Sequence, residues 1–439
     1  LNACLDRVTE VTDELRRLLA EFETELAILK GRVDGLEARV GELEATQFST
    51  TTKLSGVATF VVGANKYETS NDEDDVYNEY VGGTTFSYDL KLDLDTSFSG
   101  KDLLKTRLRA GNFSAPYLAG EFEDGPDEEI FANSLETAFN SDNNLTVDRL
   151  YYQFPVGEFT TIVGARVRQD DMLAMWPSAY TGETVLDFFT YAGAPSAYNL
   201  GLGAGVGVTW EGDNGWNASL NYVSRNAERA LVNQNEDDEE CGGFATDCGG
   251  GTATAQIGYK GDGWGIAAVW SNTLGADEDN SGATTIPVST DEIEDETDND
   301  ADNYWSVGLS GYWMPAETGW IPSISAGVGF SEVEDEGDPD TEVASWSVGL
   351  QWDDAFVAGN TAGFSFGHFP NEYYELDGTT TPDSAMLYEL YYKFQVTDNI
   401  SVTPAVYYSP SITGQDEKPD GDGSDLELFG ALVKTTFTF

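Results

Sequence analysis

The chain ends with the stretch Leu-Glu-Leu-Phe-Gly-Ala-Leu-Val-Lys-Thr-Thr-Phe-Thr-Phe, which runs from Leu426 to Phe439. Alternate positions from Phe429 onward hold Phe, Ala, Val, Thr, Phe and Phe, and they form one continuous, largely apolar face. Side chains of an extended chain alternate between the two faces of a sheet, so the stretch predicts a β-strand with one apolar face.

The same two-residue period recurs along the chain from about residue 53 onward. The alternating segments are joined by connections that are short and long in turn. An even number of such strands, with short turns at one end and long loops at the other, is typical of a bacterial outer-membrane barrel. The sequence therefore predicts an all-β, sixteen-stranded antiparallel transmembrane β-barrel over 53–439; a water-soluble β-sandwich or propeller is the alternative. The predicted strands are 54–65, 82–97, 102–112, 145–154, 159–168, 200–211, 215–226, 251–260, 264–274, 303–314, 320–331, 342–352, 360–369, 384–396, 399–410 and 424–439.

Aromatic residues support the membrane barrel. An amphipathic last strand that stops on Phe439 resembles the C-terminal signature of outer-membrane barrels. Pairs of tryptophans such as Trp210 and Trp216, or Trp313 and Trp320, border predicted short turns. Tryptophan is enriched where a barrel meets the bilayer interface, so we expect these side chains to form part of an aromatic belt.

The first 48 residues have a different period. From Leu1 onward, apolar residues recur at alternating steps of four and three. A repeat of about 3.5 residues is typical of a left-handed coiled coil, so 1–48 is predicted to be an α-helical coiled coil, and the chain an oligomer. One amphipathic helix that lies on its own domain is the alternative. The predicted core residues are Leu15, Leu19, Phe22, Leu26, Leu29, Val33, Leu36, Val40 and Leu43. They do not decide between two and three strands.

The chain is strongly acidic, with 78 Asp and Glu against 22 Lys and Arg and a formal net charge of −56. Such a surface repels phosphate backbones, which excludes a nucleic-acid partner. The eight long connections hold 50 of the 67 acids of the predicted barrel, including the runs Asp72–Asp75, Glu236–Glu240 and Asp291–Asp302. We call these acids the acidic crown and expect them to be solvated, with loosely bound Ca²⁺ or Mg²⁺ as the alternative. No run has calcium-loop spacing, so no metal ligand is assigned.

Basic residues are placed differently from the acids. Six of them fall on the polar faces of three consecutive predicted strands, opposite rows of apolar side chains. A lipid-facing Arg costs ~2–4 kcal/mol at the middle of the membrane, so these side chains are expected to line the lumen. An ordinary ion-paired sheet face is the alternative. This basic wall consists of Lys105, Arg107, Arg109, Arg149, Arg166 and Arg168.

The long connection 169–199 is rich in apolar and small residues, among them Met172, Trp176 and Phe188. An exposed surface loop would be more polar, so we expect this loop to fold into the lumen and narrow it. Its acids would then face the basic wall across a small opening, and opposed charges of this kind sort solutes. The constriction-loop acids are Asp170, Asp171, Glu183 and Asp187.

Residues with catalytic or metal-binding chemistry are few. One His and three Cys leave little for a zinc site or a His-based triad, and no nucleophile, acid pair or phosphate loop has supporting context. We therefore predict no enzyme activity, no catalytic residue and no cofactor. Cys241 and Cys248 lie in one acidic, Gly-rich connection and are predicted to form a disulfide that fixes this loop, while Cys4 stays free.

The order of these parts resembles the cyanobacterial outer-membrane porins. The resemblance rests on Leu1-Asn-Ala-Cys-Leu-Asp-Arg-Val-Thr-Glu10, the heptad helix, Thr51-Thr-Lys-Leu-Ser-Gly-Val-Ala58 and the barrel that ends in Phe439. It covers essentially the whole chain. Members of that family combine an S-layer-homology (SLH) domain, a coiled coil and a barrel similar to the carbohydrate-selective, OprB-type porins. The opening phrase is similar to the end of an SLH domain, which would precede this chain.

This resemblance implies a homotrimer in the cell outer membrane, surrounded by outer-membrane lipids, with the coiled coil in the periplasm. It also implies that the preceding SLH domain binds a peptidoglycan-linked polymer. Members are often labelled iron-uptake or carbohydrate porins. We expect a porin for passive diffusion of inorganic ions, including iron, and small polar solutes. The alternatives are a carbohydrate-selective porin and a structural tether between outer membrane and peptidoglycan.

Overall fold

The computed structural model divides the chain into two units, Leu1–Lys53 and Leu54–Phe439. The residues that it describes are 17, 22, 29–33, 51–68, 82–113, 134–180, 184–230, 242–246, 250–274, 303–317, 319–334, 341–369, 374–375, 385–412 and 427–439.

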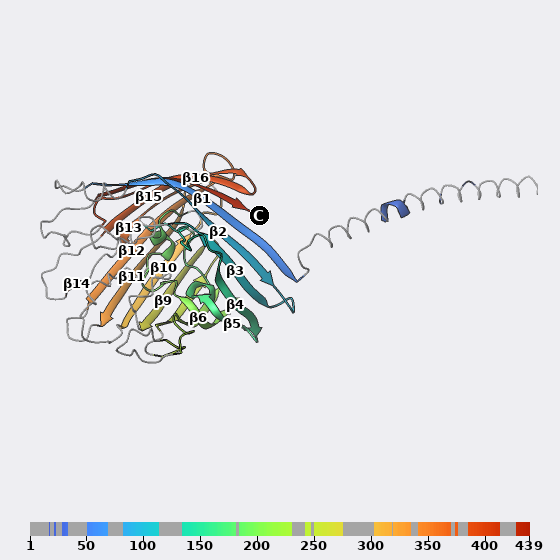
Figure 1. Ribbon diagram of the computed structural model, residues 1–439, viewed down its shortest axis with the longest axis horizontal. Coiled ribbons are helices and arrows are strands. Elements are labelled where there is room, and N and C mark those ends of the chain that lie inside the picture. The colour runs from blue at the N-terminus through green and yellow to red at the C-terminus, as the bar shows by residue number, and fades with distance from the viewer. Residues whose placement is uncertain are drawn as a thin grey trace, which may run out of the picture. The chain divides into compact units, whose positions relative to one another are not determined.

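Sixteen long strands form one closed antiparallel barrel (Figure 1). Each strand pairs with its neighbours in the sequence, and β1 closes the sheet by pairing with both β2 and β17. The strands are β1 (Thr52–Glu68), β2 (Thr85–Thr96), β3 (Leu103–Gly111), β4 (Thr146–Val156), β5 (Phe159–Arg168), β6 (Leu202–Glu211), β7 (Trp216–Ser224), β8 (Gly251–Lys260), β9 (Trp264–Leu274), β10 (Asn303–Trp313), β11 (Ser323–Glu334), β12 (Thr341–Asp353), β13 (Thr361–Phe369), β15 (Ala385–Thr397), β16 (Ile400–Ser409) and β17 (Glu427–Thr438). The two-residue strand β14 (Tyr374–Glu375) pairs with the start of β12.

The closed antiparallel sheet confirms the predicted sixteen-stranded barrel, and no predicted strand boundary is wrong by more than three residues. The two-residue alternation was sufficient to locate the strands, because every long strand has one face towards the lumen and the other on the outside of the barrel. Only β14 was not predicted, since two residues are too few to show a period.

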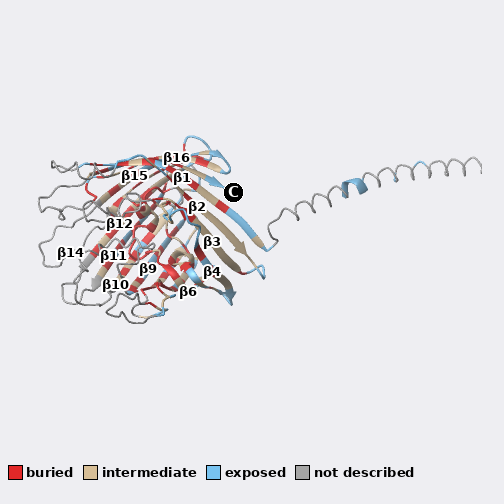
Figure 2. Ribbon diagram, in the orientation of Figure 1, coloured by how far each residue is buried: buried red, intermediate tan, exposed pale blue. Residues whose placement is uncertain are grey.

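Burial alternates along the strands, as Figure 2 shows. On β7, Asn217, Ser219 and Asn221 are buried towards the lumen, whereas Trp216 and Leu220 point outward and are 47% and 57% exposed. Polar side chains on the inner face and apolar ones on the outer face are the reverse of a water-soluble barrel. The outer face therefore matches a hydrocarbon environment.

The N-terminal unit is helical where it is described, at Arg17, Phe22 and residues 29–33. Three predicted core residues are among these, and Phe22, Leu29 and Val33 are 58%, 58% and 45% exposed. Their pairing with other helices stays a prediction. In the described part of the chain, no helix is long and apolar enough to cross a bilayer. The other predicted core residues lie outside the described residues: Leu15, Leu19, Leu26, Leu36, Val40 and Leu43.

Candidate functional site

The connection between β5 and β6 lies against the inner face of the barrel. It contains two short 3-10 helices, η2 (Gln169–Met172) and η3 (Asp187–Tyr191). Serine side chains from three distant strands bind its backbone. Ser219 Oγ of β7 accepts a hydrogen bond from Ala174 N (2.6 Å), and Ser325 Oγ of β11 accepts hydrogen bonds from Ala179 N (2.8 Å) and Tyr180 N (3.0 Å). Ser345 Oγ of β12 donates a hydrogen bond to Gly193 O (3.1 Å). The loop therefore spans the lumen, where the apolar composition of 169–199 had placed it.

Glycines on the inner face allow this loop to approach the wall. A Cβ atom at Gly327 would lie 1.9 Å from the carbonyl oxygen of Ala192, and one at Gly349 would lie 2.5 Å from the ring of Tyr180. No other residue fits such distances, because glycine alone lacks a Cβ. The Gly-rich strands of this barrel thus serve the packing of the loop.

A buried carboxylate fixes the middle of the loop. Glu389 of β15 is 1% exposed, and its Oε1 accepts a hydrogen bond from Tyr180 OH (2.7 Å). Its Oε2 accepts from the backbone N–H groups of Val185 (3.1 Å) and Leu186 (2.7 Å). Three donors compensate the burial of this charge. Sequence reasoning missed Glu389, although an acid at an inward position of an aromatic strand was a usable signal.

A second loop segment, from the β3–β4 connection, lies beside the first. Glu136 N donates to Val185 O (3.0 Å) and Asp187 N donates to Ser134 O (2.8 Å). Leu135 and Leu186 form an isolated antiparallel bridge between them. The lumen is therefore narrowed by two loops, of which the sequence indicated only the one at 169–199.

Charged side chains form a cross-strand ladder on the inner face of β2 and β3. Arg107 Nε and Nη2 donate to the two carboxylate oxygens of Asp93 at 2.8 and 3.0 Å. Arg109 binds Asp89 in the same way, at 2.9 and 2.6 Å. Lys105 Nζ lies 2.9 Å from Asp95 and 3.2 Å from Asp93. The ladder consists of Asp89, Asp93, Asp95, Lys105, Arg107 and Arg109.

The acids of this ladder were missed at the sequence level. Asp89, Asp93 and Asp95 share one face of β2, opposite a row of outward leucines at 90, 92 and 94. That alternation was visible in the sequence and indicated three lumen carboxylates beside the predicted bases. The wall is therefore built of ion pairs instead of unopposed positive charge.

Two further predicted bases are paired with loop acids. Arg149 is 2% exposed, and its Nε lies 2.7 Å from Asp171 Oδ2. Arg168 binds both oxygens of Asp170, at 2.5 and 2.6 Å. Burial would raise the pKa of Asp170, but the charge of the Arg168 guanidinium outweighs burial and lowers that pKa. These acids meet the wall by direct contact, not across an opening.

Arg166 is the exception, and its predicted place on the inner wall is wrong. A β-bulge shifts the register of β5 against β4 and β6 just before this residue. After the bulge, Val167 is fully buried on the inner face, while Arg166 is exposed and pairs across the strands with Leu150, which is 40% exposed on the outer face. The inserted residue reverses the side-chain parity on which the prediction relied.

Asp187 and Glu136 are buried acids of the two loop segments. Burial raises the pKa of Asp187 to about 6, although hydrogen bonds from Tyr191 OH (2.8 Å) and Thr190 Oγ1 (3.2 Å) oppose this shift. Burial would also raise the pKa of Glu136, but Lys91, whose Nζ lies 3.9 Å away, and other bases lower it. Asp187 therefore titrates close to neutral pH, near its pKa of about 6.

We expect a pH dependence that follows from Asp187. Its pKa is about 6 in the folded loop against 3.8 for an ordinary Asp, so the folded protein binds this proton more tightly. Protonation between pH 7 and 5 should therefore stabilise the folded-in loop and remove one negative charge from the lumen. The ionised fraction falls from about nine tenths to about one tenth over this range. Zero-current potentials should shift towards anions on acidification.

The matched variant is Asp187→Asn, which keeps an acceptor oxygen for Tyr191 and cannot ionise. Its zero-current potential should already resemble the acidified parent at pH 7 and change less between pH 7 and 5. An unaltered pH profile in this variant would assign the dependence to another group.

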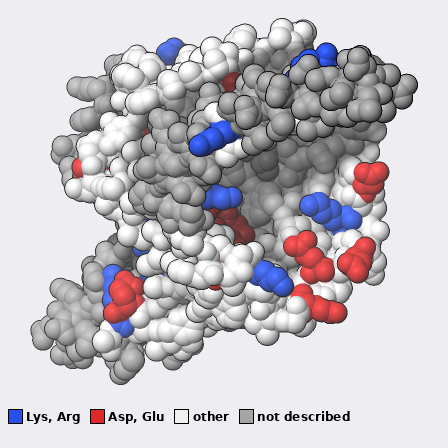
Figure 3. All heavy atoms as spheres, turned by 90° about the vertical axis from the view of Figure 1, so that its right-hand side faces the viewer, with Lys and Arg blue, Asp and Glu red and all other residues white. Residues whose placement is uncertain are grey.

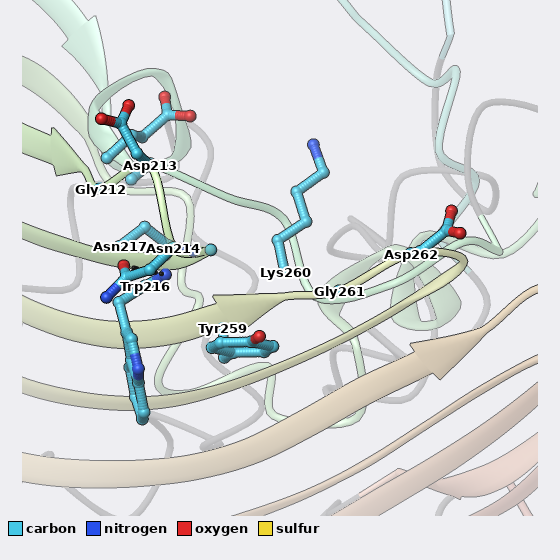
Figure 4. Close-up of a pocket in the computed structure, with 12 residues that line it drawn as sticks. Gly212, Asp213, Asn214, Trp216, Asn217, Tyr259, Lys260, Gly261 and Asp262 are labelled. Atoms are coloured by element: carbon cyan, nitrogen blue, oxygen red, sulfur yellow. Dashed lines mark hydrogen bonds between the residues drawn. The ribbon is translucent and has the colours of Figure 1, made fainter.

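The end of the barrel with the short turns carries charges of both signs around a hollow (Figure 3). A cavity of about 470 Å³ opens there beside the β6–β7 and β8–β9 turns, and Ala174 of the folded-in loop lines it. Figure 4 shows the Lys260 side chain between Asp213 on one side and Asp262 on the other. Asp213, Lys260 and Asp262 thus place charges of both signs at this end of the barrel.

Other predicted site residues lie outside the described residues: Glu183, Cys241, Cys248 and the acidic-crown runs named above. The disulfide and the loose binding of Ca²⁺ or Mg²⁺ by the crown therefore stay predictions. Within the described ranges, no group of three or more His, Cys, Asp or Glu side chains is arranged to hold a metal ion.

A closed, antiparallel barrel with a polar lumen, narrowed by loops that fold inward, defines a porin. Residues 10–439 match the carbohydrate-selective porin, OprB family, and the chain belongs to that family. Porins of this kind are outer-membrane channels, and channels are typically not enzymes. The suspected kinship with OprB-type porins is thus confirmed, whereas an SLH domain and a coiled coil are not shown.

Two cyanobacterial proteins and one solved structure are similar to this chain. An uncharacterized protein of Nostoc sp. is 31% identical over 100% of this chain and 76% of that protein. An uncharacterized protein of Synechocystis sp. is 27% identical over 100% of this chain and 80% of its own length. OprB of Pseudomonas putida, solved at high pH, superposes with a TM-score of 0.59 at 13% identity and covers 91% of this chain and 96% of that one. This last likeness concerns the fold alone.

Proposed function

We propose that this porin passes small polar solutes by passive diffusion, with neutral sugars as the favoured class and inorganic ions as a weakly sorted second class. The observation that carries the proposal is the pairing of lumen charges. Each of Lys105, Arg107 and Arg109 lies within ion-pair distance of a carboxylate on β2. The sequence alone favoured inorganic ions and small polar solutes, with a carbohydrate-selective porin as an alternative; the paired charges make sugars the favoured class in this proposal.

Paired charges act on ions and on neutral solutes in different ways. The fields of a guanidinium and a carboxylate held about 3 Å apart largely cancel at the distance of a passing ion, so the ladder sorts ions weakly. The same groups present donors and acceptors side by side. Sugar hydroxyls can exchange their water hydrogen bonds for these at little net cost. A wall of paired charges thus suits neutral polyols and gives little preference to cations over anions.

Passage of inorganic ions, iron included, is the second candidate function. The acidic crown supports it, since 50 acids in the long connections would concentrate cations at one mouth. Exposed charges are screened within ~8 Å at physiological salt, so the crown should affect how cations reach the mouth more than how they cross the lumen.

The assembly belongs to the same proposal. The unbroken heptad pattern of 1–48 supports a homotrimer whose helices form a periplasmic coiled coil, while outer-membrane lipids surround the barrel. In this proposal, a preceding SLH domain would bind a peptidoglycan-linked polymer. The pore could then also serve as a tether between the two layers.

Purified protein in liposomes and in planar bilayers tests the solute classes. We expect rapid swelling with a monosaccharide and a small cation preference in the zero-current potential that shrinks as salt rises. Ion current without sugar flux would replace the sugar proposal by the ion pore. Neither flux in a folded protein would leave the structural tether as the function.

A further inference from the structure

The cavity of about 470 Å³ at the short-turn end of the barrel lies directly beside the folded-in loop. Ala174 of the loop lines it, and Ala174 N donates a hydrogen bond to Ser219 Oγ on the inner face of β7. The β6–β7 and β8–β9 turns form most of the remaining lining, and a hydrogen bond of 2.9 Å from Lys260 N to Gly215 O joins them. A solute that has passed the loop therefore reaches this cavity on its way out.

One side chain of the cavity lining has an unsatisfied acceptor. Asn217 of β7 is 4% exposed, and its amide nitrogen donates to Met175 Sδ at 3.2 Å. Its Oδ1 has no hydrogen-bond partner among the described residues. A buried acceptor without a donor costs free energy. A thioether sulfur is a weak acceptor, so little holds the amide against turning towards an occupant of the cavity that carries hydroxyl groups.

Charged side chains around the same cavity have no partner among the described residues. Lys260, Asp213 and Asp262 line it and are exposed, and none of the three forms an ion pair or a side-chain hydrogen bond in the described part of the chain. Figure 4 shows the Lys260 side chain between the two carboxylates. The bases of the ladder on β2 and β3 are paired, whereas these groups remain available to a ligand.

The chemistry of the lining favours a neutral polyol over a metal ion. Its three acids, Glu211, Asp213 and Asp262, do not form a group that could hold a metal ion. The carboxylates, an amide and an ammonium instead offer acceptors and a donor in several directions, and each sugar hydroxyl can both donate and accept. The volume lies within the usual range for small-ligand pockets and leaves space for bridging waters around a monosaccharide.

We propose that this cavity is an exit subsite, in which a neutral monosaccharide binds weakly after it has passed the folded-in loop; this rests on the proposed passage of sugars. Lys260 donates to one hydroxyl, Asp213 and Asp262 accept from hydroxyls on either side, and Asn217 binds the innermost one. Short turns face the periplasm in such barrels, so the subsite lies on the periplasmic side. Sugar and protein exchange water hydrogen bonds for mutual ones at small net gain, so the sugar is released readily. The subsite makes sugar flux saturable.

Glucose binding to the full chain tests the subsite. Lys260→Met/Asp213→Asn should raise the dissociation constant for glucose about tenfold, because it removes two charge-assisted hydrogen bonds from exposed turns that the barrel does not need for folding. Saturation-transfer NMR titrations on the detergent-solubilised protein measure this constant. Uptake into proteoliposomes at rising glucose concentration should saturate in the parent and stay closer to linear in the variant.

Lys101→Met/Glu158→Gln is the matched control, since both residues are exposed on other short turns of the same end and lie outside the cavity lining. It should bind glucose like the parent. Unchanged binding in Lys260→Met/Asp213→Asn would overturn the subsite, and so would an equal loss in the control. Binding of glucosamine but not of glucose would overturn the neutral class and assign a cationic ligand. Glucose flux without glucose binding would overturn the subsite alone, whereas binding without flux would overturn the proposed passage alone.

Discussion

Neutralising the two arginines of the ladder should make the pore strongly cation-selective. In Arg107→Gln/Arg109→Gln the carboxylates of Asp93 and Asp89 lose the guanidinium groups that bind them at 2.6–3.0 Å. Each keeps one lysine nearby, Lys105 at 3.2 Å from Asp93 and Lys91 at 3.6 Å from Asp89. Each positive charge removed from a position a few ångströms from a permeating ion contributes about 1–3 kcal/mol at an effective dielectric constant of 20. The cation-to-anion permeability ratio should therefore rise about tenfold. Zero-current potentials in a salt gradient measure this ratio.

Replacing the acids of the ladder should have the opposite effect on selectivity. Asp89→Asn/Asp93→Asn should shift the zero-current potential towards anions by a similar amount, because the arginines then stand unopposed. Lys101→Gln, on the exposed β2–β3 turn, is the control for losing a base, and Asp74→Asn/Asp75→Asn in the crown is the control for losing two acids. Both controls should change selectivity much less, because Lys101 is exposed, the crown acids are expected from the sequence to be solvated, and charges in water are screened. Shifts of the same sign in the two ladder variants would contradict the pairing.

Removing the Glu389 carboxylate should open the pore. Glu389→Ala deprives Tyr180 OH and the N–H groups of Val185 and Leu186 of their acceptor. Each unsatisfied buried donor costs about 1–3 kcal/mol, so the middle of the loop should leave the wall. Single-channel conductance should rise about twofold by the loss of this obstruction, and larger sugars should enter. Conductance records and swelling rates measure the two effects.

Three further variants separate loop release from general damage. Glu389→Gln retains one acceptor oxygen and should change conductance much less than Glu389→Ala. Gly327→Val should act like Glu389→Ala, because its side chain would collide with the Ala192 carbonyl. Ala326→Val, on the outer face of the same strand, should have little effect. Normal conductance in both Glu389→Ala and Gly327→Val would mean that this loop does not limit the pore.

The barrel could be predicted from the sequence because its signal is local and repeats sixteen times. The bulge before Arg166 could not, since a single inserted residue leaves the apolar alternation of neighbouring positions almost unchanged. The error therefore fell on a residue after the insertion, whereas Lys105, Arg107 and Arg109 lie on β3, whose register with β2 has no shift.

Contacts between residues far apart in the sequence were the second feature that the sequence could not predict. The composition of 169–199 indicated a loop that avoids water, but its anchors lie far away in the sequence: Glu389 is 209 residues from Tyr180, and Ser325 is 146 residues from Ala179. Single-sequence patterns contain no information on such pairs. The acids of β2 are a different case. They alternate with leucines along β2, and this local pattern is sufficient to predict that the acids point into the lumen.

The central claim is that neutral, sugar-sized solutes pass a lumen narrowed by a folded-in loop beside paired charges. The swelling rate of proteoliposomes in isosmotic solutions of sugars of increasing size tests it most directly. We predict fast swelling with a monosaccharide, a steep decline between disaccharide and tetrasaccharide, and a decline displaced to larger sugars in Glu389→Ala. Swelling no faster than in protein-free liposomes, from a preparation that conducts ions, would contradict the account.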